Sequence, residues 1–261
     1  MLSKKQRAQN ADWIETASKI EEIVSKDELD KLVKATVKEI KRKVKGKKAA
    51  YAWSGGKDSI VLNKICEAAG VNASMIGVCD LEYPAFMKWI EKNKPEGCTI
   101  INTKQNLEWL AKHEEMLFPQ DCAKASRWFS IVQHRAQQQY FKDNELDILI
   151  LGRRRSDGNY VGNGDNIYTN GKGITRYSPL ADWSHEHILA YIHYYKLSLP
   201  PIYDWKNGYT CGTHPWAARQ WTGSIENGWQ EVYEIDHTIV EHAAEYLQSA
   251  KAFIEGVAQC K

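Results

Sequence analysis

The sequence predicts an α/β fold, a twisted parallel sheet with helices on both faces, from two observations. Short apolar runs that suit buried strands alternate along the chain with segments of helical period. Parallel neighbours need a crossover connection, usually a helix, so this alternation is typical of a parallel sheet. The expected strands are 49–53, 74–78, 98–101 and 147–151, and the expected intervening helices are 60–69, 85–93, 107–117 and 126–143.

Helical segments extend the predicted sheet domain at both ends. From Asp27 to Val44 apolar residues recur every three or four positions, which predicts an amphipathic helix, and a shorter helix containing Trp13 precedes it. The stretch 231–257 again has a helical period. Residues 156–180 are rich in Gly, Asn, Asp and Tyr and have no sustained period, so we expect a loop there. Ser184 is the expected N-cap of a further helix.

Composition favours a globular cytoplasmic protein. Hydrophobic residues make up 43% of the 261 residues, and no apolar run approaches the roughly 20 residues that span a bilayer. The N-terminus has no secretory pattern, and the six cysteines are dispersed without a CxxC pair, which favours reduced thiols. Residues 1–48 hold 14 basic and 8 acidic residues. This excess is either a solvated face or a surface for nucleic acid, a partner protein or a second copy of the chain.

A glycine-rich loop with phosphate-binding character follows the first expected strand. It reads Ser54-Gly55-Gly56-Lys57-Asp58-Ser59 and opens a helix. Glycines let the backbone approach an anion, and free amides at a helix start favour phosphate oxygens. Lys57 adds positive charge, and the two serine hydroxyls can donate hydrogen bonds. Asp58 is expected either to cap the helix or to hold Mg²⁺.

A second cluster of charge ends the last expected strand. Gly152 is followed by Arg153, Arg154 and Arg155, at the carboxyl edge of the sheet where α/β proteins bind ligands. Guanidinium groups there can hold phosphate or sulfate oxygens. Three like charges repel one another unless an anion lies among them, so we expect these four residues to bind a phosphate or sulfate.

These motifs together resemble the PP-loop ATP pyrophosphatase superfamily, whose loop reads SGGxDS. With lysine at the variable position, the loop resembles the branch of this superfamily that contains phosphoadenosine phosphosulfate (PAPS) reductase and the small subunit of ATP sulfurylase. Residues 151–157 resemble that branch's G-x-R-R-x-E-S element, and 178–204 resemble its P-[LI]-x-D-W, helix, L-P-x-x-x-Y-D stretch. Residues 80–84 match its D-T-G-x-x-F-P-E element only in part.

The resemblance covers about residues 47–215 and implies an adenine nucleotide α-hydrolase-like, Rossmann-like domain. Residues 1–46 and 216–261 are then helical segments outside it. It implies that Asp80 lies near the nucleoside and that Asp182 is either a polar contact in the active site or a helix cap. Together with the loop and the arginines, it makes Lys57, Asp58, Arg154 and Asp182 the candidate catalytic residues.

The cysteines do not identify a thiol-dependent reaction. PAPS reductases carry a C-terminal E-C-G-L-H motif that this chain lacks, and Cys260 stands without its neighbours. We expect no iron–sulfur cluster, since the cysteines are dispersed. Cys211 and His214 have the spacing of half a zinc site, which Cys122, His185 or His187 could complete, but we expect no zinc. Whether Cys122, Cys211 or Cys260 is reactive stays open.

Cleavage of ATP between its α and β phosphates needs no protein nucleophile, only a cradle for pyrophosphate, a divalent metal and cations. We therefore expect an enzyme that binds ATP or PAPS, with Mg²⁺, and adenylylates an unidentified acceptor. Reduction of PAPS by a thiol donor is the first alternative. A nucleotide-binding partner protein without turnover is the second.

Overall fold

The computed structural model describes residue 2 and residues 9–259 of the chain. Its contacts divide the chain into two compact units. The first unit draws on the ranges 1–76, 88–101 and 137–213, and the second on 77–87, 102–136 and 214–261. The chain therefore crosses from one unit to the other within β2 and near the end of β3, two strands of the sheet.

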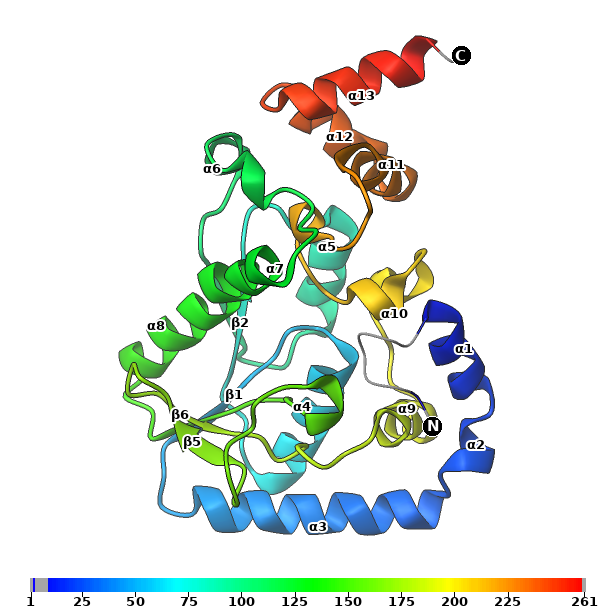
Figure 1. Cartoon of the computed structure of the whole chain (residues 1–261). Helices are drawn as coiled ribbons and strands as arrows, with labels where there is room; N and C mark the ends of the chain where they lie inside the picture. The colour runs from blue at the N-terminus through cyan, green and yellow to red at the C-terminus, as the bar shows by residue number, and fades with distance from the viewer. Residues whose placement is uncertain (1, 3–8, 260–261) are drawn as a thin grey trace. The chain divides into compact units, whose positions relative to one another are not determined.

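A six-stranded sheet in the order β3-β2-β1-β4-β6-β5 forms the centre of the fold (Figure 1). Its strands are β1 Ala49–Ala52, β2 Ser74–Val78, β3 Thr99–Asn102, β4 Ile148–Ile150, β5 Ile167–Thr169 and β6 Thr175–Tyr177. β1 is parallel to β2 and β4, and β4 is parallel to β6. Only β5 runs antiparallel among these pairs. The predicted α/β fold is confirmed, with one antiparallel strand at its edge.

The described helices connect and cover the strands. They are α1 Asn10–Ser18, α2 Ile20–Ile23, α3 Lys26–Val44, α4 Lys57–Ala69, α5 Pro84–Asn93, α6 Leu107–Ala111, α7 Cys122–Phe129, α8 Arg135–Asp143, α9 His185–Tyr194, α10 Gly208–Cys211, α11 Ile225–Ile235, α12 His237–Ala243 and α13 Gln248–Gln259. None of these described helices combines the length and the apolar character needed to cross a bilayer.

Local chemistry fixes the ends of the two helices that position the site. Ser25 caps α3 by accepting the Glu28 amide, and Leu29 and Ile40 are buried on its inner face. α4 begins after Gly56 and ends at Gly70, whose φ of 84° is the left-handed conformation that glycine adopts without strain. α3, α4 and α9 pack on one another within the first unit (Figure 1).

Two expectations about single elements were wrong. The loop expected at 156–180 contains the β5–β6 hairpin, in which Tyr168 is paired with Arg176. The helix expected at 107–117 ends at Ala111 and is followed by a separate 3₁₀ turn. The stretch 231–257 is helical as expected and is divided among α11, α12 and α13; Asp236 leaves the helical conformation between the first two and caps α12.

Candidate functional site

The glycine-rich loop lies between β1 and α4, and its own hydrogen bonds hold it in shape. The Ser54 amide donates to Ser59 Oγ at 3.0 Å, and the Ser59 hydroxyl donates to the Gly56 carbonyl at 2.9 Å. Gly55 has φ 67°, which a side chain would strain. A Cβ on Gly56 would lie 3.2 Å from Thr213 Oγ1. The backbone therefore requires glycine at position 55, and a side chain at position 56 would crowd two neighbouring hydroxyl groups.

Lys57, Asp58 and Arg154 form a buried ion-pair cluster at this loop. Lys57 Nζ lies 2.7 Å from one oxygen of Asp58, and Arg154 Nη2 lies 2.9 Å from the other. Lys57 is 2% exposed and Arg154 is fully buried. Charges in such surroundings interact more strongly than charges in water. The structure thus brings together three of the four predicted catalytic residues.

The cluster continues from Arg154 to Asp157 and His185. Arg154 Nη2 lies 3.1 Å from an Asp157 carboxylate oxygen and 3.1 Å from His185 Nδ1. An arginine can only donate, so Nδ1 accepts and the imidazole proton is on Nε2. Burial, and then the charge of Arg154, lowers the pKa of His185. His185 is therefore a neutral imidazole that supports the guanidinium.

The N-terminal helix α1 covers the loop lysine. Trp13, which is fully buried, places its indole ring 4.8 Å from Lys57 Nζ, a cation–π contact. The same ring meets His185 edge-on with 4.7 Å between centroids and stacks on Tyr209 at 5.8 Å. The Asn10 side chain accepts the Tyr209 amide at 2.8 Å and ties α1 to α10. The ammonium group is thus shielded from solvent by the N-terminal segment.

One amide at the start of α4 already has a partner. The Lys57 N–H donates to the Tyr203 hydroxyl at 2.8 Å, and burial raises the pKa of that phenol. Free amides were expected at this position, so the structure differs from the expectation. The Tyr203 oxygen occupies the direction from which a phosphate oxygen would otherwise accept.

The three consecutive arginines point to three different partners. Arg153 donates to the Tyr168 hydroxyl at 2.9 Å, while Arg154 enters the buried cluster. Arg155 is exposed and pairs with Asp182. The repulsion expected among the arginines is therefore relieved by hydrogen bonds and carboxylates of the protein itself.

Two other predicted residues near these arginines have contrasting positions. A Cβ on Gly152 would lie 3.4 Å from the backbone oxygen of Asp58, so the strand end approaches the loop closely. Asp182, in contrast, has a side chain that is 75% exposed. It is not the cap of α9, because Ser184 accepts the His187 amide there. Asp182 stays a prediction as an active-site contact.

Asp80 belongs to the second unit, where it accepts a hydrogen bond from the Asn102 side chain. It lines a hollow of about 290 Å³ together with Glu82, Trp216 and Tyr246. Burial raises the pKa of Glu82 to about 8, so that carboxyl group is protonated at neutral pH. The role of Asp80 near the nucleoside remains a prediction.

The described cysteines divide by burial. Cys66, Cys79 and Cys98 are buried, and burial raises the pKa of each thiol, which disfavours the nucleophilic thiolate. Cys122 is exposed and Cys211 is half-buried, whereas Cys260 lies outside the described residues. No three His, Cys, Asp or Glu side chains among the described residues form a group that could hold a metal ion.

The motifs of the sequence did not indicate that Trp13, Asp157, His185 and Tyr203 lie at the glycine-rich loop or its ion-pair cluster. Asp157 and Tyr203 lie within the motifs that carried the resemblance, so the motifs were a usable signal. His185 follows the helix cap and offered no signal of its own. Trp13 precedes Lys57 by 44 positions and shows only helical spacing, which gives no indication that it contacts Lys57.

The chain is similar in sequence to a known protein family. Residues 48–213, more than half of the chain, match the model of the phosphoadenosine phosphosulfate reductase domain. A curated phosphoadenosine phosphosulfate reductase of Emericella nidulans is 28% identical over 110 residues, which are 42% of this chain. The match spans about one third of that relative's length, 33%.

The fold is similar to that of a solved structure. The phosphoadenylyl-sulfate reductase of Candida auris, in a phosphate complex, superposes with a TM-score of 0.51 at 17% identity, covering 69% of this chain and 92% of that one. An NH₃-dependent NAD synthetase from Campylobacter jejuni gives a TM-score of 0.46 at 14% identity, covering 84% and 93%. The family expected from the motifs is confirmed, and the chain belongs to the phosphoadenosine phosphosulfate reductase domain family.

Proposed function

We propose that this protein is an adenine-nucleotide-dependent enzyme that cleaves ATP between its α and β phosphates and adenylylates an acceptor. The acceptor forms a bond to the α phosphorus while the bond to the bridging oxygen breaks, and pyrophosphate leaves with that electron pair. The observation that carries the proposal is the buried cluster in which Lys57 and Arg154 share the carboxylate of Asp58 at the loop.

This cluster supplies what phosphate cleavage needs. Lys57 and Arg154 are fixed cations in a poorly hydrated site, where they stabilise developing negative charge strongly. The close approach of Gly152 to the backbone of Asp58 leaves the strand end beside the loop without an intervening side chain. No protein thiolate takes part, in keeping with the buried thiols of Cys66, Cys79 and Cys98.

A divalent metal fits this proposal through Asp58. Mg²⁺ is commonly held by one or two carboxylates together with substrate phosphates, and Asp58 is the carboxylate of the loop. Bound Mg²⁺ would neutralise phosphate charge. Asp58 in turn holds Lys57 and Arg154 in place through its two oxygens.

Reduction of PAPS is the second candidate, and the comparisons favour it, since the named relatives are PAPS reductases. Cys211 is half-buried and lies two positions before Thr213, which neighbours Gly56 of the loop. In this reaction the attacking thiol would come from Cys122, Cys211 or Cys260, or from an external donor. The thiolate would bond to the sulfate sulfur while the bond to the phosphate oxygen breaks and the adenosine bisphosphate leaves. A second thiol would then form a disulfide with the first and release sulfite.

One pair of assays separates the candidates. Purified protein is incubated with ATP and Mg²⁺ across pools of acceptors and pyrophosphate is measured, and in parallel with PAPS and a dithiol while sulfite is measured. Pyrophosphate formation that is lost in Lys57→Ala supports adenylyl transfer. Sulfite formation without pyrophosphate would overturn it in favour of reduction, and nucleotide binding without either product would indicate a partner protein without turnover.

A matched variant makes the result specific to the loop. Lys64→Ala removes a lysine from the exposed side of α4, where it pairs with Glu67 at 2.9 Å. It should retain parental activity, because the pair lies on the surface. Equal loss in Lys57→Ala and Lys64→Ala would point to a general electrostatic effect and contradict the role given to Lys57.

A further inference from the structure

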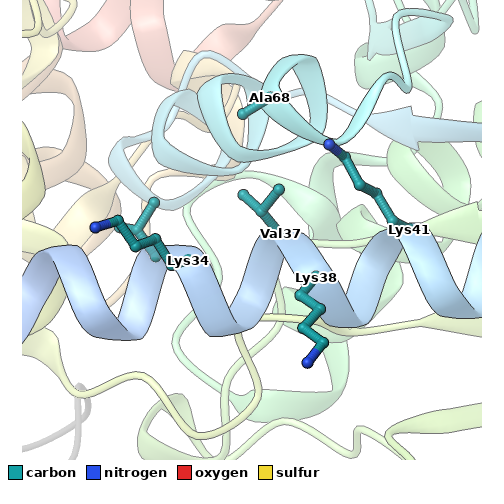
Figure 2. Close-up of a pocket in the computed structure, with 6 residues that line it drawn as sticks. Lys34, Val37, Lys38, Lys41 and Ala68 are labelled. Atoms are coloured by element: carbon teal, nitrogen blue, oxygen red, sulfur yellow. The ribbon is translucent and has the colours of Figure 1, made fainter.

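An apolar groove bordered by lysines lies between α3 and α4, away from the phosphate loop. Its volume is about 400 Å³, and Val33, Val37 and Ala68 line it together with Lys34, Lys38 and Lys41. Figure 2 shows Val37 pointing from α3 towards the turn of α4 that carries Ala68, with Lys34 and Lys41 extending on either side of Val37. The groove therefore combines an apolar floor with a positively charged border.

Lys34, Lys38 and Lys41 line the groove, and Lys31 lies one turn before them on α3. The four are separated alternately by three and four residues, so their backbone positions share one side of α3 over about 15 Å. Figure 2 shows the Lys38 side chain extending away from α4. All four are exposed. Among the described residues none of the four ammonium groups has an ion-pair or hydrogen-bond partner, whereas Lys26, Arg42 and Lys43 of the same helix do.

We propose that this groove, named here the α3–α4 groove, binds an acidic amphipathic helix of a partner protein. The apolar residues of such a helix, repeating every three or four positions, would cover Val33, Val37 and Ala68. Glutamate or aspartate residues on its adjoining face would meet the row of lysines, whose spacing is itself helical. Charge complementarity thus predicts that the partner helix carries negative charge and that its acidic residues repeat every three or four positions.

The apolar floor distinguishes this occupant from a nucleic acid. Phosphate groups could neutralise the lysines, but a phosphodiester backbone has no apolar side chain with which to cover Val33 and Val37. The lining also contains neither an arginine nor an aromatic side chain, the groups on which bases stack. A protein helix satisfies both parts of the groove.

The proposal is tested with a designed peptide as the probe. A fluorescent helical peptide of about 18 residues carries leucines every three or four positions and glutamates on the neighbouring face, and a scrambled peptide of the same composition is the control. Binding to the full-length protein is followed by fluorescence anisotropy at low and high salt. The helical peptide should bind at least about tenfold more tightly than the scrambled one, and salt should weaken the binding.

Two variants tie the binding to the groove. The triple variant Lys34→Glu/Lys38→Glu/Lys41→Glu should bind the helical peptide with an affinity about tenfold or more below that of the parent. Val37→Ser should lower this affinity several-fold without changing the charge of the protein. Lys88→Glu/Lys92→Glu/Lys112→Glu removes equal charge from positions that do not line the groove, and should leave peptide binding within about twofold of the parent.

The opposite results overturn the proposal. Equal affinity for the helical and scrambled peptides, or equal loss in the two triple variants, would reduce the groove to a general basic surface. A duplex or single-stranded oligonucleotide could instead bind the parent more tightly than the peptide does. If Lys34→Glu/Lys38→Glu/Lys41→Glu abolished that binding, the ligand of the groove would be a nucleic acid. Nucleotide binding and thermal unfolding of the two triple lysine variants should match the parent, because these lysines are exposed and lie outside the ion-pair cluster of Lys57, Asp58 and Arg154.

Discussion

Arg154 and Arg155 are consecutive residues, and each forms an ion pair with aspartate. The pairs of Arg154 are buried, whereas the pair of Arg155 is exposed to solvent. The Arg154 side chain is fully buried between Asp58 and Asp157, at 2.9 and 3.1 Å. The Arg155 side chain is 44% exposed and pairs with Asp182, itself 75% exposed. Replacing each arginine by methionine keeps much of the side-chain volume and removes the charge. The pair of variants therefore measures what burial adds to an ion pair.

The expected magnitudes differ widely. Arg154→Met leaves two carboxylates in the buried cluster with Lys57 as their remaining cation, and breaking such a pair on one side costs about 3–5 kcal/mol. It also leaves His185 Nδ1 without the donor at 3.1 Å. Arg155→Met breaks a solvent-exposed pair, for which the cost is about 1 kcal/mol or less.

Urea unfolding at pH 7 measures both costs. The deficit of Arg154→Met should exceed that of Arg155→Met by about 2–4 kcal/mol. A cost for Arg154→Met below about 1 kcal/mol, or equal costs for the two variants, would refute the view that a buried charge network holds the loop together.

Three further changes test other parts of the structure. Trp13→Ala should raise amide hydrogen exchange across α1, because Trp13 is the one buried residue of that helix; unchanged exchange in 10–18 would contradict this. Glu82 has a pKa raised from 4.5 to about 8, so its contribution to stability is full below about pH 4.5 and is lost as the pH rises through 8. In urea unfolding, Glu82→Gln should therefore equal the parent in stability at acid pH and exceed it by up to about 5 kcal/mol at alkaline pH; parallel pH profiles would argue against it. Gly228→Ala places a Cβ 2.3 Å from the ring of Phe118 and should lower the free energy of unfolding by about 1–3 kcal/mol. Gly256→Ala, with open space around it, should raise the free energy of unfolding by about 0.5–1 kcal/mol in the same assay. Equal effects of the two substitutions would exclude a steric cause.

The sequence predicted the elements whose patterns are local. β1, β2, α3 and α4 lie where apolar runs or three-to-four-residue spacing indicate, within a few residues. The β5–β6 hairpin was not predictable in the same way. Its strands have three residues each, too few for a period to emerge, and they exist because β6 pairs with β4. The pairing partner is distant in the chain, so the signal is not local.

The candidate site likewise contains residues that local motifs predict and contacts that only the fold determines. The loop and Arg154 were recognisable because glycines, a lysine and arginines follow strands in the order that phosphate chemistry requires. Spacing alone did not show that Asp58 would pair with both Lys57 and Arg154, since that depends on where β4 ends relative to α4. The contact of Trp13 with Lys57 depends on the path of the N-terminal segment, which has no motif.

The charges of the cluster bear on how the proposed substrate is bound. Lys57 and Arg154 contribute two positive charges, and Asp58 and Asp157 contribute two negative ones, while His185 is neutral. A lone anion therefore meets no net positive charge here, and it gains the ammonium group only by competing with Asp58. In a complex of a polyphosphate with Mg²⁺, Asp58 would hold the metal, whose charge would offset the carboxylates beside the phosphates. On the proposed function, Asp58 is thus the residue through which the loop distinguishes a metal–nucleotide complex from a simple anion.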